Sequence, residues 1–365
     1  MSPDPSLYSP IQLGALSLAN RIVMAPLTRN RAGAGNAPQA MNVEYYQQRA
    51  SAGLIISEAT QVSEDGIGYP HTPGIHSPEQ VEQWRKVTNA VHQQGGKIVN
   101  QLWYCGRISH PSMLPNGAQP VSASAIQPEG QCMTYSGMQD FVQPRALEVD
   151  EIAQIVDQYR VAAHNAKAAG FDGIEVHAGN GYLLDQFLRD GTNKRTDEYG
   201  GSVENRMRLL LEILEAVFEA WQPNQVGVRV SPENAFNDIA DSQPQQTFGY
   251  VAQRLSQLGL AYLHVLEGDM ASGERRVDYQ QIKKQFNGFY MANNGYDKAK
   301  AETAIKQQQA DAVAFGALYI ANPDLVERFK QQAELNIPDP NTFYGGDTKG
   351  YTDYPSLASE TEAVV

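Results

Sequence analysis

Three polar side chains in one short stretch have the types and the spacing of a site that binds an oxygen atom and transfers a proton. His177 and Asn180 are three residues apart at the end of an apolar run, and Tyr182 follows two residues later. If a helical turn follows the run, this spacing places His177 and Asn180 on one face. Two donors that converge on one point can stabilise negative charge on a carbonyl oxygen, and removing one such donor costs about 3 kcal/mol of barrier lowering.

Tyr182 could supply the proton in the same site. A phenol is a weak acid with a pKa of about 10, which suits the protonation of a carbanion-like carbon. Each of the three residues also has a structural alternative. A single histidine after a strand is usually part of a hydrogen-bonded scaffold, and a single tyrosine usually belongs to the core. The three residue types alone leave both interpretations open.

The elements that must position these residues follow a regular order along the chain. Apolar runs of strand length alternate with helical patterns. The predicted strands are 21–28, 54–62, 97–103, 173–177, 226–231, 262–266, 289–293 and 312–316. The predicted helices are 41–52, 78–94, 150–169, 204–221, 247–258, 279–286, 298–309 and 324–332.

Eight strand–helix units in series predict an α/β fold, a TIM (β/α)8 barrel with its helices outside. A doubly wound open sheet is the structural alternative, although the GxGxxG turn that marks a dinucleotide-binding open sheet is absent from the sequence. Segment 106–149, after the third strand, is rich in Pro, Ser and Gly, and it predicts an inserted loop with a short hairpin that caps the barrel mouth. We expect residues 1–365 to form a single domain.

In such a barrel the chemistry lies where the strands end. Those positions hold many neutral donors and one fixed cation, Arg229, with few carboxylates. This set suits the binding of a polar ring, and it does not suit hydrolysis by paired carboxylates or a metal site. Gly295 and Gly316 follow the last two strands, so their loops could bind a phosphate, assisted by the dipole of a helix that begins near Asp324.

Composition excludes several other classes of function. The chain has 41 acidic and 28 basic residues and a net charge of −13, which disfavours nucleic-acid binding. It has no apolar run of about 18 residues and no layout of a secretory signal, so we expect a cytoplasmic protein without a membrane partner. Its two cysteines, Cys105 and Cys132, are too few for a zinc or iron–sulfur site.

The chain resembles the Old Yellow Enzyme family over nearly its whole length, and within it the bacterial ene-reductases. The matching segments are 20–29, 48–56, 101–103, 106–107, 177–206, 314–316, 322–325, 343–346 and 350–355. Motifs of this length in this order are specific to the family. The resemblance implies an FMN-dependent ene-reductase, with non-covalent FMN and with NADPH or NADH as the hydride donor. Its substrate would be a small alkene activated by a carbonyl or nitro group, or a nitro compound, and the protein would be a monomer or homodimer.

The resemblance also implies a role for each site residue. Those implied to hold FMN are Pro26, Leu27, Thr28, Ala59 and Gln101 along the ring, Arg229 at N1 and O2, and Asn294, Gly295, Gly316 and Ala317 at the phosphate. Those implied to shape the substrate pocket are Tyr69, Trp103, Asn237 and Tyr351. His177 and Asn180 would bind the substrate oxygen, and Tyr182 would protonate the carbon opposite the hydride, in a two-step reaction at one shared site.

Some positions depart from the family pattern. Several relatives carry an arginine at the place of Ala317, so we expect weaker FMN retention here. Tyr104 and Cys105 follow Trp103 where many relatives have His-Thr or a similar pair. Three other functions remain alternatives: an aldolase-like barrel, although no lysine ends a predicted strand; an iron–sulfur flavin barrel, which needs more cysteines; and a flavin storage protein, which needs no proton donor.

Overall fold

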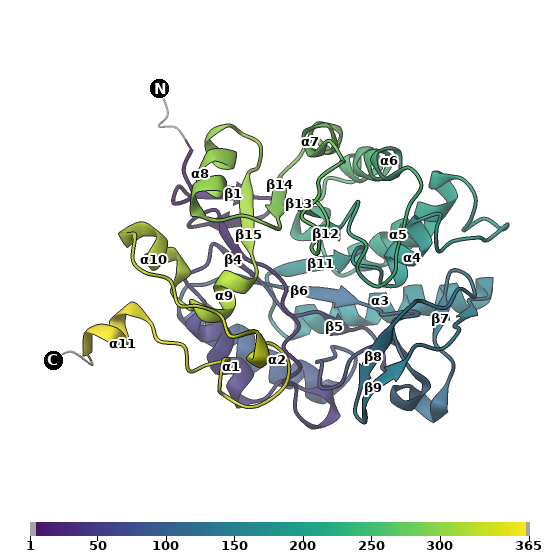
Figure 1. Ribbon diagram of the computed structural model, residues 1–365, viewed down its shortest axis with the longest axis horizontal. Coiled ribbons are helices and arrows are strands. Elements are labelled where there is room, and N and C mark those ends of the chain that lie inside the picture. Colours follow the sequence, from purple (N-terminus) through teal and green to yellow (C-terminus); the bar gives the residue numbers. More distant parts are fainter. Residues whose placement is uncertain (1–4, 363–365) are drawn as a thin grey trace.

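The computed structural model describes residues 5–362, and its central feature is a closed parallel barrel (Figure 1). The strands of this barrel are β3 (Ile22–Met24), β4 (Leu54–Ile56), β6 (Ile98–Trp103), β11 (Gly173–His177), β12 (Val226–Val230), β13 (Tyr262–Leu266), β14 (Tyr290–Asn293) and β15 (Ala312–Phe315). The ring closes because β15 pairs with β3 while β6 pairs with both β4 and β11. The predicted TIM (β/α)8 barrel is therefore confirmed.

Two of the expected strands are much shorter than the sequence pattern suggested, and four others are shorter by one residue. Within 21–28 only β3 is paired, since Pro26 has no N–H to donate and the chain leaves the ladder before it. The expected strand 54–62 is divided into β4 and β5 (Thr60–Gln61), and both pieces pair with β6. Both interruptions lie at the carboxyl ends of strands, where the side chains of a barrel site must turn inward.

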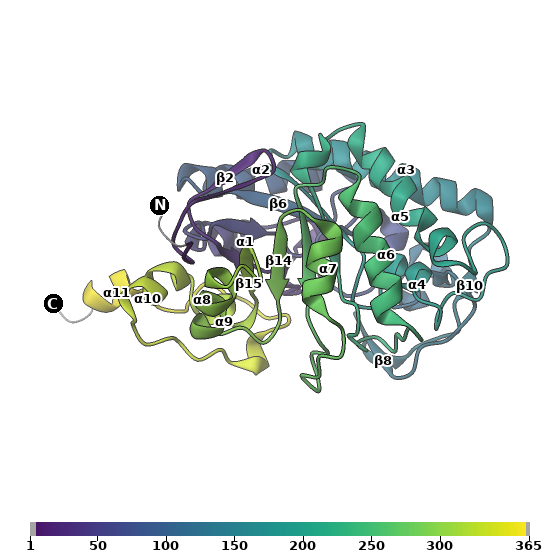
Figure 2. The same cartoon turned by 90° about the horizontal axis from the view of Figure 1, so that it is seen from above.

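All eight expected helices are present, and they lie outside the strands (Figure 2). They are α1 (Ala40–Gln48), α2 (Pro78–Gln93), α3 (Val149–Ala168), α5 (Val203–Phe218), α6 (Pro244–Ser256), α7 (Tyr279–Phe286), α8 (Lys298–Lys306) and α10 (Leu325–Gln331). Local chemistry fixes several starts: Ser77 and Gln80 form a capping box before α2, with Pro78 at its first position. Three short helices were not expected: α4 (Leu183–Leu188), α9 (Ala317–Ala321) and α11 (Leu357–Glu362).

Apolar side chains fill the barrel and its outer layer. An antiparallel hairpin of β1 (Ile11–Leu13) and β2 (Leu16–Leu18) packs Leu13 and Leu18 with inward residues of the barrel strands. Inside the ring, Gly227 makes room for Tyr262, because a Cβ at that glycine would lie 2.2 Å from the tyrosine ring. Side chains of the hairpin and of the barrel interior are packed together at the other end of the strands. A site can therefore form only at the carboxyl ends of the strands.

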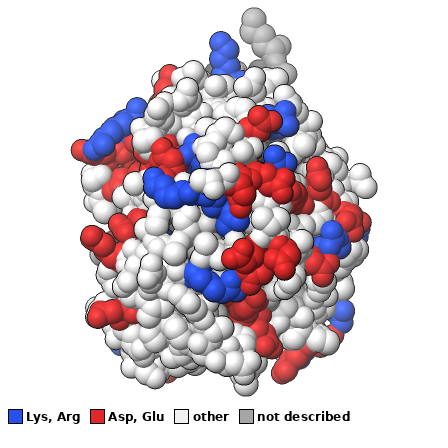
Figure 3. Space-filling model, turned by 90° about the vertical axis from the view of Figure 1, so that its right-hand side faces the viewer, with Lys and Arg blue, Asp and Glu red and all other residues white. Residues whose placement is uncertain are grey.

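Segment 106–149 contains two pairs of short strands. β8 (Gln131–Thr134) and β9 (Gly137–Asp140) form an antiparallel hairpin, and β7 (Val121–Ser122) pairs in parallel with β10 (Arg145–Ala146). Acidic and basic side chains are interspersed on the molecular face drawn in Figure 3. Within residues 5–362, no helix combines the length and the apolar character that crossing a bilayer requires.

Candidate active site

A cavity of about 800 Å³ opens at the carboxyl ends of the barrel strands. Its lining comes from the ends of many strands, as the fold requires. The predicted site residues that line it are Pro26, Leu27, Thr28, Tyr69, Asn180, Tyr182, Arg229, Asn237, Asn294, Gly295, Gly316 and Ala317. The structure therefore brings most of the sequence-predicted site together around one space.

Two further predicted residues form an apolar wall with the lining. Ala59 and Trp103 belong to one buried cluster with Tyr182, against which Tyr69 packs. The Trp103 ring lies 4.7 Å from that of Tyr182 and 5.8 Å from that of Tyr69, measured between centroids. These contacts hold the two tyrosines in fixed positions beside the cavity.

The turn that carries Asn180 differs from the expected helical turn. Asn180 and Gly181 both have positive φ, at 57° and 76°, and α4 starts only after Tyr182. A Cβ on Gly181 would lie 2.7 Å from the Cβ of Asn237, so only glycine fits this approach. The helical i, i+3 geometry expected for His177 and Asn180 was therefore wrong, since the chain between them is not helical and Asn180 itself is left-handed.

Hydrogen bonds orient the amide of Asn180. Asn234 Nδ2 donates to Asn180 Oδ1 at 3.1 Å, and Asn237 Nδ2 donates to the Asn180 carbonyl at 2.8 Å. The backbone N–H of Asn180 donates to Ser231 Oγ at 2.7 Å. Because Oδ1 is already an acceptor, the Nδ2 group is the part of this side chain that can donate to a ligand oxygen.

His177 is a buried neutral imidazole beside Tyr182. The two ring centroids are 5.3 Å apart. Burial, followed by the charges of Arg229 and His264, lowers the pKa of His177 well below its usual value. Its Nδ1 is buried and has no hydrogen-bond partner among the described residues. A buried polar atom of this kind indicates a ligand that completes the site.

Tyr182 and Tyr69 are joined by their hydroxyls. The Tyr182 hydroxyl donates to that of Tyr69 at 3.2 Å. Burial raises the pKa of Tyr182 well above its usual value, and Tyr69 raises it further. The phenol therefore keeps its proton at neutral pH and can act as a proton donor.

Arg229 places a fixed cation at the bottom of the cavity. Its guanidinium contacts His264 Nε2 at 2.5 Å and donates to Asn293 Oδ1 at 2.9 Å. Burial lowers the pKa of Arg229 to about 10, while Glu175 acts in the opposite direction, so the group stays charged. Gln101 does not line the cavity. Its Nε2 donates to Glu175 Oε1 at 2.7 Å.

The two loops after β14 and β15 form the other end of the cavity. Asn294 and Gly295 have positive φ, at 84° and 70°. The helix that begins at this end is α9, whose first residue is Ala317, and not the expected helix near Asp324. Ala317 carries no charge, but Arg275 donates to the Asn294 carbonyl at 2.6 Å. A terminal nitrogen of Arg275 is 3.6 Å from the position that a Cβ on Gly295 would take.

Tyr351 lies elsewhere than expected. It is fully buried, its ring stacks on that of Tyr45 at 4.1 Å, and its hydroxyl accepts a hydrogen bond from Asn42 at 2.9 Å. It is not among the residues that line the cavity. The preceding segment instead contributes Phe343 and Tyr344 to the lining, held by arginines that donate to its carbonyls.

Sequence reasoning missed the apolar side chains around the mouth of the cavity. They are Met133, Met138 and Phe141 of the hairpin region, Phe236, Met270, Phe343 and Tyr344. Four of them, Met138, Phe236, Met270 and Tyr344, are largely exposed despite their apolar character. The sequence signal that could have identified them is apolar residues within otherwise polar segments, because an exposed apolar patch usually marks a binding surface.

The residues around this cavity fit an FMN molecule. A buried cation lies at one end and a glycine-containing backbone loop with a nearby guanidinium lies at the other, which matches the electron-accepting ring and the phosphate. His177 Nδ1 and Trp103 Nε1 are buried without a partner within residues 5–362, and both rings pack against that of Tyr182, which lines the cavity. By contrast, the described residues hold no group of three or more His, Cys, Asp or Glu side chains that could bind a metal ion.

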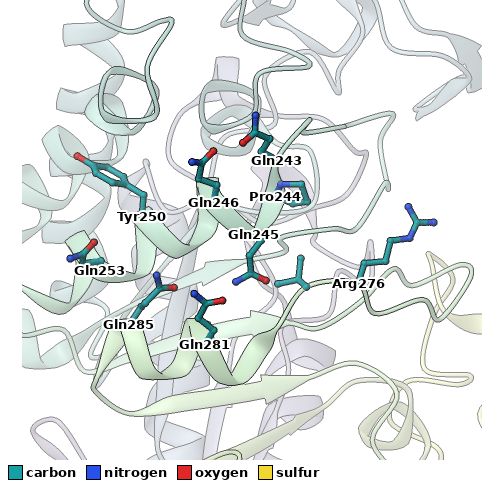
Figure 4. A pocket seen from close by; sticks show the side chains of 10 residues that line it. Gln243, Pro244, Gln245, Gln246, Tyr250, Gln253, Arg276, Gln281 and Gln285 are labelled. Carbon is teal, nitrogen blue, oxygen red and sulfur yellow. The ribbon is translucent and has the colours of Figure 1, made fainter.

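A second pocket of about 560 Å³ lies between α6 and α7 on the outside of the barrel (Figure 4). Its labelled side chains are mostly glutamines, with Tyr250 and Arg276. None of the predicted site residues lines it. The cavity at the strand ends is therefore the candidate active site.

The match to a known family covers most of the chain. Residues 6–336 match the model of the NADH:flavin oxidoreductase / NADH oxidase family. The chain is 44% identical to 12-oxophytodienoate reductase 1 of Oryza sativa subsp. japonica, over 96% of this chain and 93% of that protein. It is also 44% identical to a probable flavin mononucleotide-dependent alkene reductase of Leishmania infantum, over 96% and 97% of the two chains.

Solved structures give the same assignment. Morphinone reductase superposes with a TM-score of 0.95 at 47% identity and covers 99% of both chains. The Old Yellow Enzyme homologue from Zymomonas mobilis superposes with a TM-score of 0.94 at 46% identity, over 97% of this chain and 100% of that one. The expected family, flavin cofactor and enzyme class are confirmed. The chain belongs to the NADH:flavin oxidoreductase / NADH oxidase family and is an FMN-dependent oxidoreductase of the Old Yellow Enzyme type.

Proposed function

We propose that the protein reduces the C=C bond of an alkene activated by a carbonyl or nitro group, with NADPH or NADH as the source of reducing equivalents. When bound, FMN would supply hydride transfer at its N5 atom, from the nicotinamide and then toward the substrate. The names of the alkene reductase and the 12-oxophytodienoate reductase among the relatives support this substrate class. The observation that carries the proposal is that Asn180 and Tyr182 line one cavity, while the buried imidazole of His177, which is not itself part of the lining, lies next to the Tyr182 ring.

The residues that would hold FMN come from both ends of the cavity. Pro26, Leu27 and Thr28 would line the ring, with Ala59 and Gln101 at its pyrimidine side and Arg229 at N1 and O2. Asn294, Gly295, Gly316 and Ala317 would present backbone N–H groups to the phosphate. Since Ala317 has no cation, we propose that Arg275 supplies the positive charge beside the phosphate.

His177 and Asn180 would bind the oxygen of the substrate's activating group. The imidazole of His177 is neutral, and the Asn180 Nδ2 group can donate because its Oδ1 is occupied by Asn234. Two neutral donors stabilise negative charge that develops on the oxygen without transferring a proton to it. These two residues therefore lower the barrier by electrostatic stabilisation.

Tyr182 would deliver the proton to the carbon next to the activating group, on the side opposite the hydride. Its raised pKa keeps the phenol protonated, and Trp103 and Tyr69 fix its ring. The Tyr69 hydroxyl accepts the hydrogen bond from Tyr182 and so orients the phenol. Trp103, Tyr69 and Asn237 would shape the substrate pocket. Tyr351 would not, because it packs on Tyr45 outside the cavity lining.

Further properties of the protein belong to the same proposal. One domain over residues 1–365 is supported by a continuous buried cluster that extends from Leu7 to Tyr351. A cytoplasmic location is consistent with two cysteines that form no disulfide. We propose a monomer or homodimer that acts on small molecules and binds no nucleic acid, since its net charge is −13.

Initial-rate kinetics with NADPH and 2-cyclohexenone test the shared site. Because the nicotinamide must leave before the alkene binds, double-reciprocal plots at several NADPH concentrations should be parallel. The same experiment with N-ethylmaleimide and a nitroalkene tests the breadth of the substrate class. Intersecting lines would show that both substrates bind together, and would rule out one shared site.

A further inference from the structure

A chain of hydrogen bonds inside the barrel links two residues that would contact the flavin ring. Glu175 accepts a hydrogen bond from Gln101 Nε2 on one oxygen at 2.7 Å, and its other oxygen lies 2.8 Å from His264 Nδ1. Arg229 Nη1 lies against the imidazole of His264, 2.5 Å from Nε2 and 3.2 Å from Nδ1. One carboxylate therefore connects, directly or through one imidazole, to both Gln101 and Arg229.

Strand register explains why these four residues meet. Glu175 on β11 pairs directly with Gln101 on β6, and Arg229 on β12 pairs with His264 on β13. Glu175 is two residues before His177 on the same strand, so both side chains point to the same face of the sheet. The network thus forms the layer of the barrel interior that supports the candidate active site.

The charges of the network require Glu175 to be ionised. Glu175 and His264 are fully buried, and Arg229 is 5% exposed. Arg229, with a pKa of about 10, keeps its proton at neutral pH, and its other partner, Asn293, is neutral. Burial lowers the pKa of His264 to about 4, so its ring is neutral, with Nδ1 facing the carboxylate and Nε2 next to the Arg229 guanidinium. Glu175 is then the one negative charge in the network that offsets Arg229.

The hydrogen bonds also select the orientation of Gln101. With Nε2 committed to Glu175, the amide has its Oε1 atom available as an acceptor. The pyrimidine edge of an isoalloxazine has one N–H donor between two carbonyl acceptors. An acceptor from Gln101 and a cation from Arg229 complement that edge.

We propose that Glu175 is a positioning residue of the flavin site, which orients Gln101 and, through His264, Arg229, and whose charge sets the midpoint potential of bound FMN. This inference rests on the proposed roles of Gln101 and Arg229. Without the carboxylate charge, Arg229 is uncompensated, so accepting electrons onto the ring becomes more favourable. A neutral glutamine at 175 also has only one acceptor oxygen, so it cannot satisfy both Gln101 and His264.

The test is the midpoint potential of FMN at pH 8 in the purified holoenzyme of a Glu175→Gln variant, with a Glu58→Gln variant as the matched control, because Glu58, whose pKa is about 7, is ionised at that pH. Glu58 is an equally buried carboxylate that bonds to Tyr46 and has no bond to Gln101 or Arg229. Glu175→Gln should raise the potential by at least a tenfold change in the reduction equilibrium, about 30 mV for a two-electron couple. Glu58→Gln should leave it unchanged. Equal potentials in Glu175→Gln and the wild type would overturn the proposal.

A second pair of variants tests the link if Glu175→Gln does not fold. His264→Leu removes both hydrogen bonds, whereas His264→Gln keeps one donor and one acceptor. FMN release on dilution, followed by flavin fluorescence, should be at least tenfold faster in His264→Leu and close to the wild type in His264→Gln. Equal release from the two variants would refute the relay. Neither measurement uses an alkene, so both remain informative if the substrate class is wrong.

Discussion

The hydroxyl of Tyr182 donates a hydrogen bond to the hydroxyl of Tyr69 at 3.2 Å on the wall of the cavity. This contact fixes the direction of the phenol. Burial raises the pKa of both side chains. Tyr182 therefore keeps its proton until a more basic substrate carbon forms next to it.

Replacing Tyr182 with phenylalanine should separate the two halves of the reaction. Loss of a positioned general acid costs about 100-fold to 10,000-fold in rate. In stopped-flow experiments, Tyr182→Phe should slow the reaction with 2-cyclohexenone by about 100-fold, at the low end of that range. The reaction with NADPH should keep its wild-type rate. Tyr69→Phe, which keeps the Tyr182 proton, should slow enone reduction less. An unchanged rate with 2-cyclohexenone in Tyr182→Phe would mean that another group supplies the proton.

The oxygen-binding pair should make the enzyme insensitive to pH near neutrality. The pKa of His177 lies well below its usual value because of burial, Arg229 and His264, so the imidazole stays neutral as pH rises from 6 to 8. Asn180 does not titrate at all. The rate constant for 2-cyclohexenone should therefore be constant over this range. Asn180→His adds a titratable group and should introduce a pH dependence. An inflection near pH 6.5 in the wild type would contradict this account.

FMN retention should depend on the positive charge near the phosphate loop. Ala317→Arg adds a guanidinium beside Gly316 and should slow FMN release by about tenfold, because a hydrogen bond to a charged group contributes about 1.5–3 kcal/mol. Arg275→Gln should speed release, more at low salt than at high salt. Arg276→Gln is the matched control, since that side chain is 79% exposed and pairs with Glu274.

Riboflavin, which lacks the phosphate, shows whether this charge acts where we propose. Its affinity for the apoprotein should be the same in the wild type, Ala317→Arg and Arg275→Gln. An unchanged FMN dissociation constant in Ala317→Arg would show that the wild-type site does not lack a positive charge at the phosphate.

Glu58 should make the stability of the protein decrease with rising pH. Burial raises the pKa of Glu58 to about 7, above its usual 4.5, so the folded state binds this proton more tightly than the unfolded state. The stabilisation is complete below pH 4.5 and is lost as pH rises through 7, by up to about 3 kcal/mol. When the free energy of unfolding is measured in urea between pH 5 and 8, it should fall less with rising pH in Glu58→Gln than in the wild type. The exposed Glu44→Gln should keep the wild-type slope, and an unchanged slope in Glu58→Gln would refute the assignment.

The barrel was predictable because its periodic pattern repeats eight times. The first and last residues of the strands and helices were harder to predict. Pro26 ended the first strand early, and α4 and α9 have six and five residues, too short for a helical period to show. The left-handed turn at Asn180 and Gly181 was also hidden, since Asn237, which packs against Gly181 and donates to the Asn180 carbonyl, is distant in sequence.

The site itself was predictable where a motif carried it, and not where distant segments meet. Tyr351 lies within a matched motif, but it packs on Tyr45 instead of reaching the cavity. The exposed apolar residues of the mouth come from the β8–β9 hairpin, which carries Met138, and from three loops distant in sequence, which carry Phe236, Met270 and Tyr344. Glu175 and His264 were missed because each alternates with apolar residues in a strand, so that only the barrel register reveals their contact.

The most direct test is the colour of the purified protein in the absence of air. It should be yellow from bound FMN, bleach when NADPH is added, and regain its colour when 2-cyclohexenone follows. This sequence requires a flavin that takes hydride from the nicotinamide and passes it to an activated alkene. A bleached protein that stays colourless with the enone, yet recovers with oxygen, would contradict the proposed activity.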